Sequence, residues 1–211
     1  MKNFILLTGA LFMSAFITQA QEKSCNINFI NLESGINLSQ FDFSADEITA
    51  FKNGSFSPSQ HQALSLGFNL KGDLYLVLES AYDKYQVIGK SIDMSSSHLS
   101  YDLNYVSASA GLEYSFPVQD KVSLLASGGV TYKYFMSGFQ NIGSSSYDLV
   151  DSDFEANGYS VGAGILYQMT DATGIYLKYD SSNTYNMKDA NDSYKLTSYV
   201  YSIGMRFNLA N

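Results

Sequence analysis

Period-two alternation of apolar and small polar side chains is the feature that most restricts the fold of this chain. In the last such stretch, residues 199–207, the polar face is small and carries one charge, Arg206. The other face is uncharged and consists of Tyr199, Tyr201, Ile203, Met205 and Phe207. Successive side chains of a strand point to opposite sides, so this pattern predicts a strand with one apolar face. Periodicity alone does not decide whether that face meets a protein core or lipid.

The same alternation recurs along the chain. Strands are predicted over residues 28–39, 61–70, 74–85, 101–116, 122–136, 158–169, 175–180 and 199–207. The connections between them alternate between short turns and long polar loops, and the long loops cover residues 44–60, 86–100, 137–157 and 181–195. Nothing in the architecture of a soluble sandwich requires short and long loops to alternate. A transmembrane barrel does, because its short turns lie on one side of the membrane and its long loops on the other.

The aromatic residues of these strands fall into two bands. Towards the long-loop end lie Tyr132, Tyr134, Tyr159, Tyr179, Tyr199 and Tyr201. Towards the short-turn end lie Phe68, Tyr114, Phe116, Tyr167 and Phe207. Two aromatic girdles are expected where a barrel crosses the two membrane interfaces. The predicted fold is therefore all-β, an eight-stranded antiparallel up-and-down transmembrane β-barrel.

The N-terminus predicts export. Met1–Ala20 has a lysine near its start, an apolar run and a small-residue cleavage site, which are the parts of a signal peptide. Residues 21–27 are then a short periplasmic leader, in which Cys25 is expected to be an ordinary thiol without a lipid anchor. Residues 28–209 form the barrel domain. The formal net charge of -8 argues against a nucleic-acid partner, which would require a basic patch.

At this point the chain resembles the OmpA/OmpX-like superfamily of eight-stranded outer-membrane barrels. The topology carries the resemblance, together with the spacing of Tyr201, Ile203, Met205 and Phe207, which is similar to a C-terminal insertion signal. The resemblance implies a Gram-negative cell outer membrane and contact with the barrel-assembly machinery during insertion. It also implies contact with outer-membrane lipid and lipopolysaccharide, and it implies no cofactor.

Charged side chains are predicted inside the barrel, which at eight strands is just wide enough for its own side chains. The predicted network comprises Glu33, Glu79, Glu113, Lys133, Lys178, Asp180 and Arg206. Glu113, Lys178 and Arg206 are expected near the short-turn end, with Glu33, Glu79 and Asp180 nearer the middle. Buried charges must be paired, so Arg206 is expected to contact Glu33 or Glu113. A structural plug of ion pairs is favoured over an ion pathway.

Catalytic and metal-binding signals are sparse, and no catalytic, cofactor or metal site is predicted. The histidines are His61, at the top of a strand, and His98, near Ser97, Ser100 and Asp102 in a long loop. Some barrels of this size modify lipid A with a histidine, but sequence proximity does not establish a triad. An acidic loop with Asp148, Asp151, Asp153 and Glu155 leaves divalent-cation binding open.

The function expected from these patterns is that of a non-enzymatic surface protein. Long loops on a rigid scaffold are where binding residues concentrate, so the four long surface loops would support envelope integrity or surface adhesion and binding. The alternatives are a small porin-like pore and a lipid-A-modifying enzyme. No residue in the sequence identifies a ligand.

Overall fold

The computed structural model describes residues 27–43, 52–90, 98–149, 155–185 and 194–209. These residues form nine strands and their connections. The strands are β1 Ile27–Phe43, β2 Lys52–Lys71, β3 Leu74–Lys90, β4 His98–Gln119, β5 Val122–Ile142, β6 Ser145–Leu149, β7 Ala156–Gln168, β8 Thr173–Tyr185 and β9 Tyr194–Asn208.

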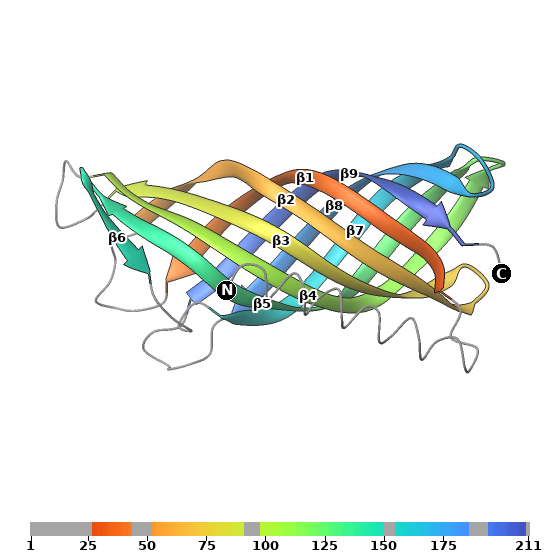
Figure 1. The fold of residues 1–211 in the computed structure, drawn as a ribbon, viewed down its shortest axis with the longest axis horizontal. Coiled ribbons are helices and arrows are strands. Elements are labelled where there is room, and N and C mark those ends of the chain that lie inside the picture. The colour runs from red at the N-terminus through yellow and green to blue at the C-terminus, as the bar shows by residue number, and fades with distance from the viewer. Residues whose placement is uncertain (1–26, 44–51, 91–97, 150–154, 186–193, 210–211) are drawn as a thin grey trace.

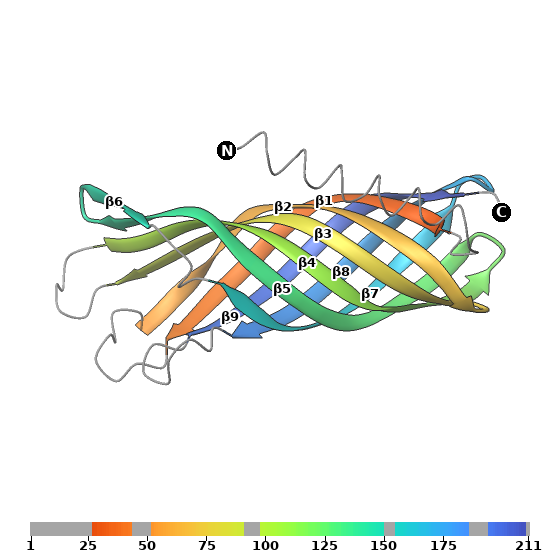
Figure 2. The same cartoon turned by 60° about the horizontal axis from the view of Figure 1, so that its bottom comes forward.

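The sheet closes on itself as an antiparallel barrel. Its strand order is β4-β3-β2-β1-β9-β8-β7-β5-β6, and an additional ladder between β4 and β5 completes the circle. β6 pairs with β5 alone and projects beyond the mouth, so eight strands form the wall (Figure 2). The short turns after β2, β4 and β7 lie at the end where β9 finishes, opposite β6 (Figure 1). The predicted eight-stranded up-and-down barrel is confirmed.

Much of the sequence expected to be long loop is strand instead, and the loop boundaries were wrong. β2 already begins at Lys52, β3 continues to Lys90, and β4 begins at His98. β5 continues to Ile142, and the small strand β6 occupies part of the third predicted loop. Polar side chains do not prevent a strand as long as the backbone ladder continues, since it is the ladder that satisfies the backbone groups. β4, at 22 residues, is about twice the 9–11 residues that a membrane-spanning strand needs.

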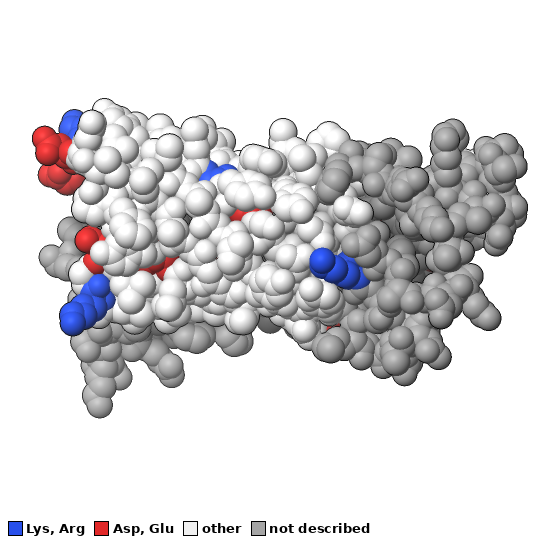
Figure 3. Space-filling model, turned by 180° about the vertical axis from the view of Figure 1, so that it is seen from behind, with Lys and Arg blue, Asp and Glu red and all other residues white. Residues whose placement is uncertain are grey.

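The two faces of the wall differ as the alternation predicts. On β9, Tyr201 and Ile203 are 54% and 57% exposed, whereas Ser202 and Arg206 are buried. The space-filling view shows an outer wall with few charged side chains among the described residues (Figure 3). Outward aromatic residues contact each other on this wall: Tyr179 and Tyr201, at the middle of β8 and β9, have ring centroids 5.1 Å apart, and Tyr114 and Phe116, near the short-turn end of β4, have centroids 4.3 Å apart. An apolar exterior of this extent requires an apolar surrounding.

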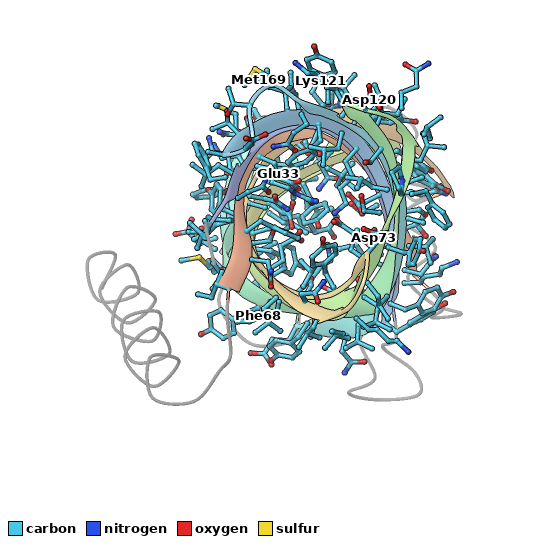
Figure 4. The ribbon with its side chains drawn as sticks, turned by 90° about the vertical axis from the view of Figure 1, so that its right-hand side faces the viewer. Glu33, Phe68, Asp73, Asp120, Lys121 and Met169 are labelled. Atoms are coloured by element: carbon cyan, nitrogen blue, oxygen red, sulfur yellow. The ribbon has the colours of Figure 1, made fainter. Side chains whose placement is uncertain are left out.

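Inside the barrel, two apolar layers enclose polar side chains. The layer nearer the long-loop end consists of Tyr85, Leu103, Tyr105, Phe135, Ala156 and Leu196, all buried. The layer nearer the short turns consists of Leu125, Leu166 and Tyr176, with Phe29 buried beside Tyr75. Viewed from the short-turn end, side chains fill the interior, and Glu33 is among those pointing inward (Figure 4).

Two inward glycines make room for the rings of the lower layer. Gly67 lies opposite Phe29 across the β1–β2 ladder, and Gly204 lies opposite Tyr176 across the β8–β9 ladder. A Cβ atom on either glycine would overlap the facing ring. The ring therefore covers the bare backbone of its partner strand, an arrangement that also fixes the register of the two strands.

Gly67→Ala is expected to destabilise the barrel by roughly 1–3 kcal/mol, because the methyl group forces Phe29 out of its position. The measurement is the urea midpoint of the barrel refolded in lipid vesicles, read from the heat-modifiable gel band. Gly128→Ala is the matched control, since a Cβ atom there has its nearest neighbours at 3.7 and 3.9 Å. Equal midpoints for the two variants would contradict the proposed fit.

Candidate functional site

The charged interior between the two apolar layers is the candidate site, and its lowest group is built around Arg206. Arg206 Nη2 donates to Glu113 Oε1 at 2.7 Å, and Arg206 Nε donates to Asn31 Oδ1 at 2.9 Å. The guanidinium carbon lies 3.7 Å from the centroid of the Phe29 ring. Both charged side chains are only 4% exposed. A buried, hydrogen-bonded pair of this kind ties β9 to β4 across the lumen.

The second group is built around His61 on β2. Its Nδ1 lies 2.7 Å from Asp83 Oδ1, and its Nε2 lies 2.9 Å from Glu33 Oε1. A carboxylate only accepts hydrogen bonds, so the imidazole serves both carboxylates as a donor only when both of its nitrogens are protonated. The Tyr176 hydroxyl donates to Glu33 Oε2 at 2.8 Å. His61 is thereby held by carboxylates from β1 and β3.

Two lysines complete the network. Lys133 Nζ lies 3.8 Å from Asp83 Oδ2 and donates to the Tyr85 hydroxyl, so it joins the His61 group to the upper apolar layer. Lys178 Nζ lies 3.2 Å from Asp180 Oδ2 and 3.9 Å from Glu79 Oε2. The Glu79 and Asp180 side chains are 20% and 21% exposed, in contrast to the almost fully buried groups around Arg206 and His61.

The exposed surface of these carboxylates faces a polar cavity of about 80 Å³. Glycines and hydroxyl side chains form the opposite wall, among them Gly111, Gly129, Ser109 and Thr131. Missing or short side chains on β4 and β5 therefore create the space. A cavity of this size and polarity has room for several water molecules, since one water needs about 10–15 Å³. Such water would solvate the Glu79 and Asp180 carboxylates.

The structure distributes the predicted site residues over these three groups. Of the two partners considered for Arg206, Glu113 makes the contact, and Glu33 is hydrogen-bonded to His61 instead. Lys178, expected beside Glu113 and Arg206, reaches Glu79 and Asp180. Lys133 contacts none of the predicted acids at salt-bridge distance among the described residues, and pairs with Asp83.

Sequence reasoning missed the connecting residues His61 and Asp83. Both lie on inward faces: His61 alternates with the buried Ala63 and Ser65 on β2, and Asp83 alternates with Ala81 and Tyr85 on β3. His61 was interpreted as the top of a strand because the polar residues before it resemble a loop. The two residues are direct partners in the β2–β3 ladder, and only the register reveals that.

Other predicted features lie elsewhere or outside the described part of the chain. Met1–Ala20, Cys25, Asp151 and Asp153 are outside the described residues, as is the side chain of His98. Tyr201, Ile203 and Met205 of the predicted insertion signal point outward and are exposed, and Phe207 is half-buried. Among the described residues, no three His, Cys, Asp or Glu side chains are grouped so as to hold a metal ion. That same part of the chain contains no helix long and apolar enough to span a membrane.

Residues 8–211 match the sequence profile of the family described as Outer membrane protein beta-barrel domain. The chain belongs to this family. It is therefore an outer-membrane barrel protein, which explains the largely apolar outer wall and confirms the resemblance to the OmpA/OmpX-like superfamily. No curated protein matches the chain.

Solved structures of other outer-membrane barrels share its fold. Neisserial surface protein A is 15% identical, with a TM-score of 0.55 over 86% of this chain and 96% of that one. OprG from Pseudomonas aeruginosa is 14% identical, with a TM-score of 0.55 over 88% of this chain and 97% of that one. At this level of identity the likeness shows a common fold and nothing about activity.

Arg206→Ala is expected to lower the stability of the barrel by roughly 3–5 kcal/mol, because it leaves the buried Glu113 carboxylate without its cation. Arg206→Lys should lose less, since it keeps the charge but not the fork that reaches both Glu113 and Asn31. Urea unfolding in lipid vesicles measures both changes. A double-mutant cycle with Glu113→Gln isolates the pair, and zero coupling would refute its contribution.

His61→Ala should also destabilise the barrel, by about 3 kcal/mol, because two buried carboxylates lose a shared donor. The neighbouring variant Gln62→Ala is the control, since Gln62 is exposed on the outer face of the same strand. The readout is again the urea midpoint in vesicles. A His61→Ala barrel as stable as Gln62→Ala would mean that Asp83 and Glu33 are satisfied without the imidazole.

Proposed function

We propose that this protein is a non-enzymatic outer-membrane scaffold that supports envelope integrity or binds surfaces through its long-loop end. The observation that carries the proposal is the filled interior. The upper apolar layer occupies the lumen towards the long loops, and the Arg206–Glu113 pair with Phe29 and Tyr176 occupies it towards the short turns. A barrel filled at both ends serves as a rigid support, and the end that carries β6 and the long connections offers the surface for binding.

The interior also argues against the two alternative functions. A porin-like pore needs a continuous aqueous path, whereas the polar cavity of about 80 Å³ lies between apolar layers. A lipid-A-modifying enzyme of the histidine-dependent kind needs that residue at the membrane surface, and of the two histidines only the side chain of His61 is among the described residues. His61 is 5% exposed inside the barrel and is engaged by two carboxylates. The Ser107 hydroxyl donates to Asp83 Oδ2 at 3.3 Å and not to the imidazole. These residues are therefore not arranged as a nucleophile with its base.

The proposal includes the processing of the chain. Residues 1–20 are a cleaved signal peptide, residues 21–27 a periplasmic leader and residues 28–209 the barrel domain. The outward spacing of Tyr201, Ile203, Met205 and Phe207 supports recognition by the barrel-assembly machinery. N-terminal sequencing of the mature protein tests the cleavage, and a chain that retains Met1 would refute it.

Planar bilayers containing the purified barrel are expected to show no steady, reproducible conductance, because both ends of the lumen are filled. A trimeric porin in the same bilayers is the positive control. A stable single-channel conductance that is absent with heat-unfolded protein would show that the protein is a pore and would refute the scaffold function. Mass spectrometry of lipid A from a deletion strain is expected to show unchanged masses, because the proposed scaffold does not modify lipid A.

Complementation separates the two scaffold roles. A deletion strain receives either the full protein or a variant in which a short Gly-Ser turn replaces residues 143–155, which removes β6 and spares the wall strands. If the barrel itself supports the envelope, both versions restore resistance to detergent. If the long-loop end binds external surfaces, the shortened variant loses cell adhesion while keeping detergent resistance. Full adhesion and normal detergent sensitivity in the deletion strain would refute both roles.

A further inference from the structure

The outer wall carries a shallow groove of about 460 Å³ over β4, β5 and the start of β7. Its floor contains Ala108 and Ala110, which face outward and are exposed. Their ladder partners on β5 are Tyr132 and Val130, which project from the wall at 43% and 64% exposure. The groove therefore exists because two small side chains leave the surface low beside taller neighbours.

The groove changes from apolar to polar along its length. Ala110 and Val130 line its apolar part, and Asn157 on β7 lies beside Tyr132 at the other end. The Asn157 side chain is exposed, and an amide is both a donor and an acceptor of hydrogen bonds. The Tyr132 hydroxyl donates to Glu155 Oε2 at 2.6 Å. An apolar floor with a polar rim matches an amphipathic ligand.

The position of the groove indicates which ligand that is. The outward apolar side chains of β5 extend from Leu124 to Tyr134, about the length of a membrane crossing. Val130 and Tyr132 occupy the half of this belt nearer the long loops, which are extracellular in outer-membrane barrels. The groove is thus continuous with the lipid-facing wall in the surface leaflet. The lipid of that leaflet is lipopolysaccharide, whose membrane anchor is lipid A.

We propose that this groove is a binding site for one acyl chain of lipid A, with the sugar headgroup on Asn157 and Tyr132. Glu155 already accepts a hydrogen bond from Tyr132, and a carboxylate would repel phosphate. The rim is therefore suited to the sugar hydroxyls and amides of the headgroup. This site depends on the placement of the barrel in the outer membrane and is independent of any ligand bound by the long loops.

Native mass spectrometry of the barrel, reconstituted with equal amounts of lipid A and phosphatidylethanolamine, tests the site. The parent is expected to retain a lipid A adduct in mild detergent. Ala110→Phe fills the groove and should abolish that adduct. Ile203→Phe is the matched control, because Ile203 is an exposed outward residue on β9, at the opposite side of the strand order. Asn157→Ala should weaken the adduct without filling the groove.

All variants are first checked for folding by heat-modifiable mobility, and Ala110→Leu replaces Ala110→Phe if the latter does not fold. A parent without an adduct would overturn the proposal. So would a lipid A adduct that survives in the filled variant, or equal retention of phosphatidylethanolamine. None of these results affects the conductance and adhesion assays, so this site and the scaffold function can fail separately.

Discussion

Closure of the backbone ladder is the constraint on which the rest of this structure depends. Lipid offers no hydrogen bonds, so every peptide group that crosses the membrane must pair within the wall, and only a closed barrel pairs all of its strands. The β4–β5 ladder provides that closure here. Closure in turn sends alternate side chains outward to lipid and inward to a narrow lumen. The apolar exterior and the crowded interior are consequences of one requirement.

The crowded interior explains why charges are present at all. Eight strands leave space for side chains but for little else. If every inward residue were apolar, the inner and outer faces of each strand would be alike, and the strand register would be poorly specified. Inward polar residues prevent this, and the cost of burying them is offset by pairing. Arg206 and Lys178 each pair with a carboxylate from another strand, and His61 joins two such carboxylates. The network thus links strands that the ladders do not pair, such as β4 and β9.

Unequal use of small residues gives the wall its local features. On the inside, Gly67 and Gly204 receive aromatic rings, whereas Gly111 and Gly129 face no ring and border the internal cavity. On the outside, Ala108 and Ala110 form the floor of the lipid-facing groove. The same kind of residue therefore strengthens the packing, opens an internal space or shapes the membrane surface, and the difference lies in what the opposite strand presents.

The sequence by itself determined the barrel class, the eight strands of the wall, the short turns and the apolar face of most strands, because side-chain alternation and loop length are local properties. It placed Glu79, Glu113 and Arg206 inside for the same reason. Only the tertiary structure decided the partners, since Arg206 and Glu113 are separated by 93 positions and meet across the lumen. The link between His61 and Asp83 depended on the exact β2–β3 register, which no local pattern specifies. The extension of β2 through β5 into polar sequence also escaped prediction, because backbone pairing above the membrane does not require apolar side chains.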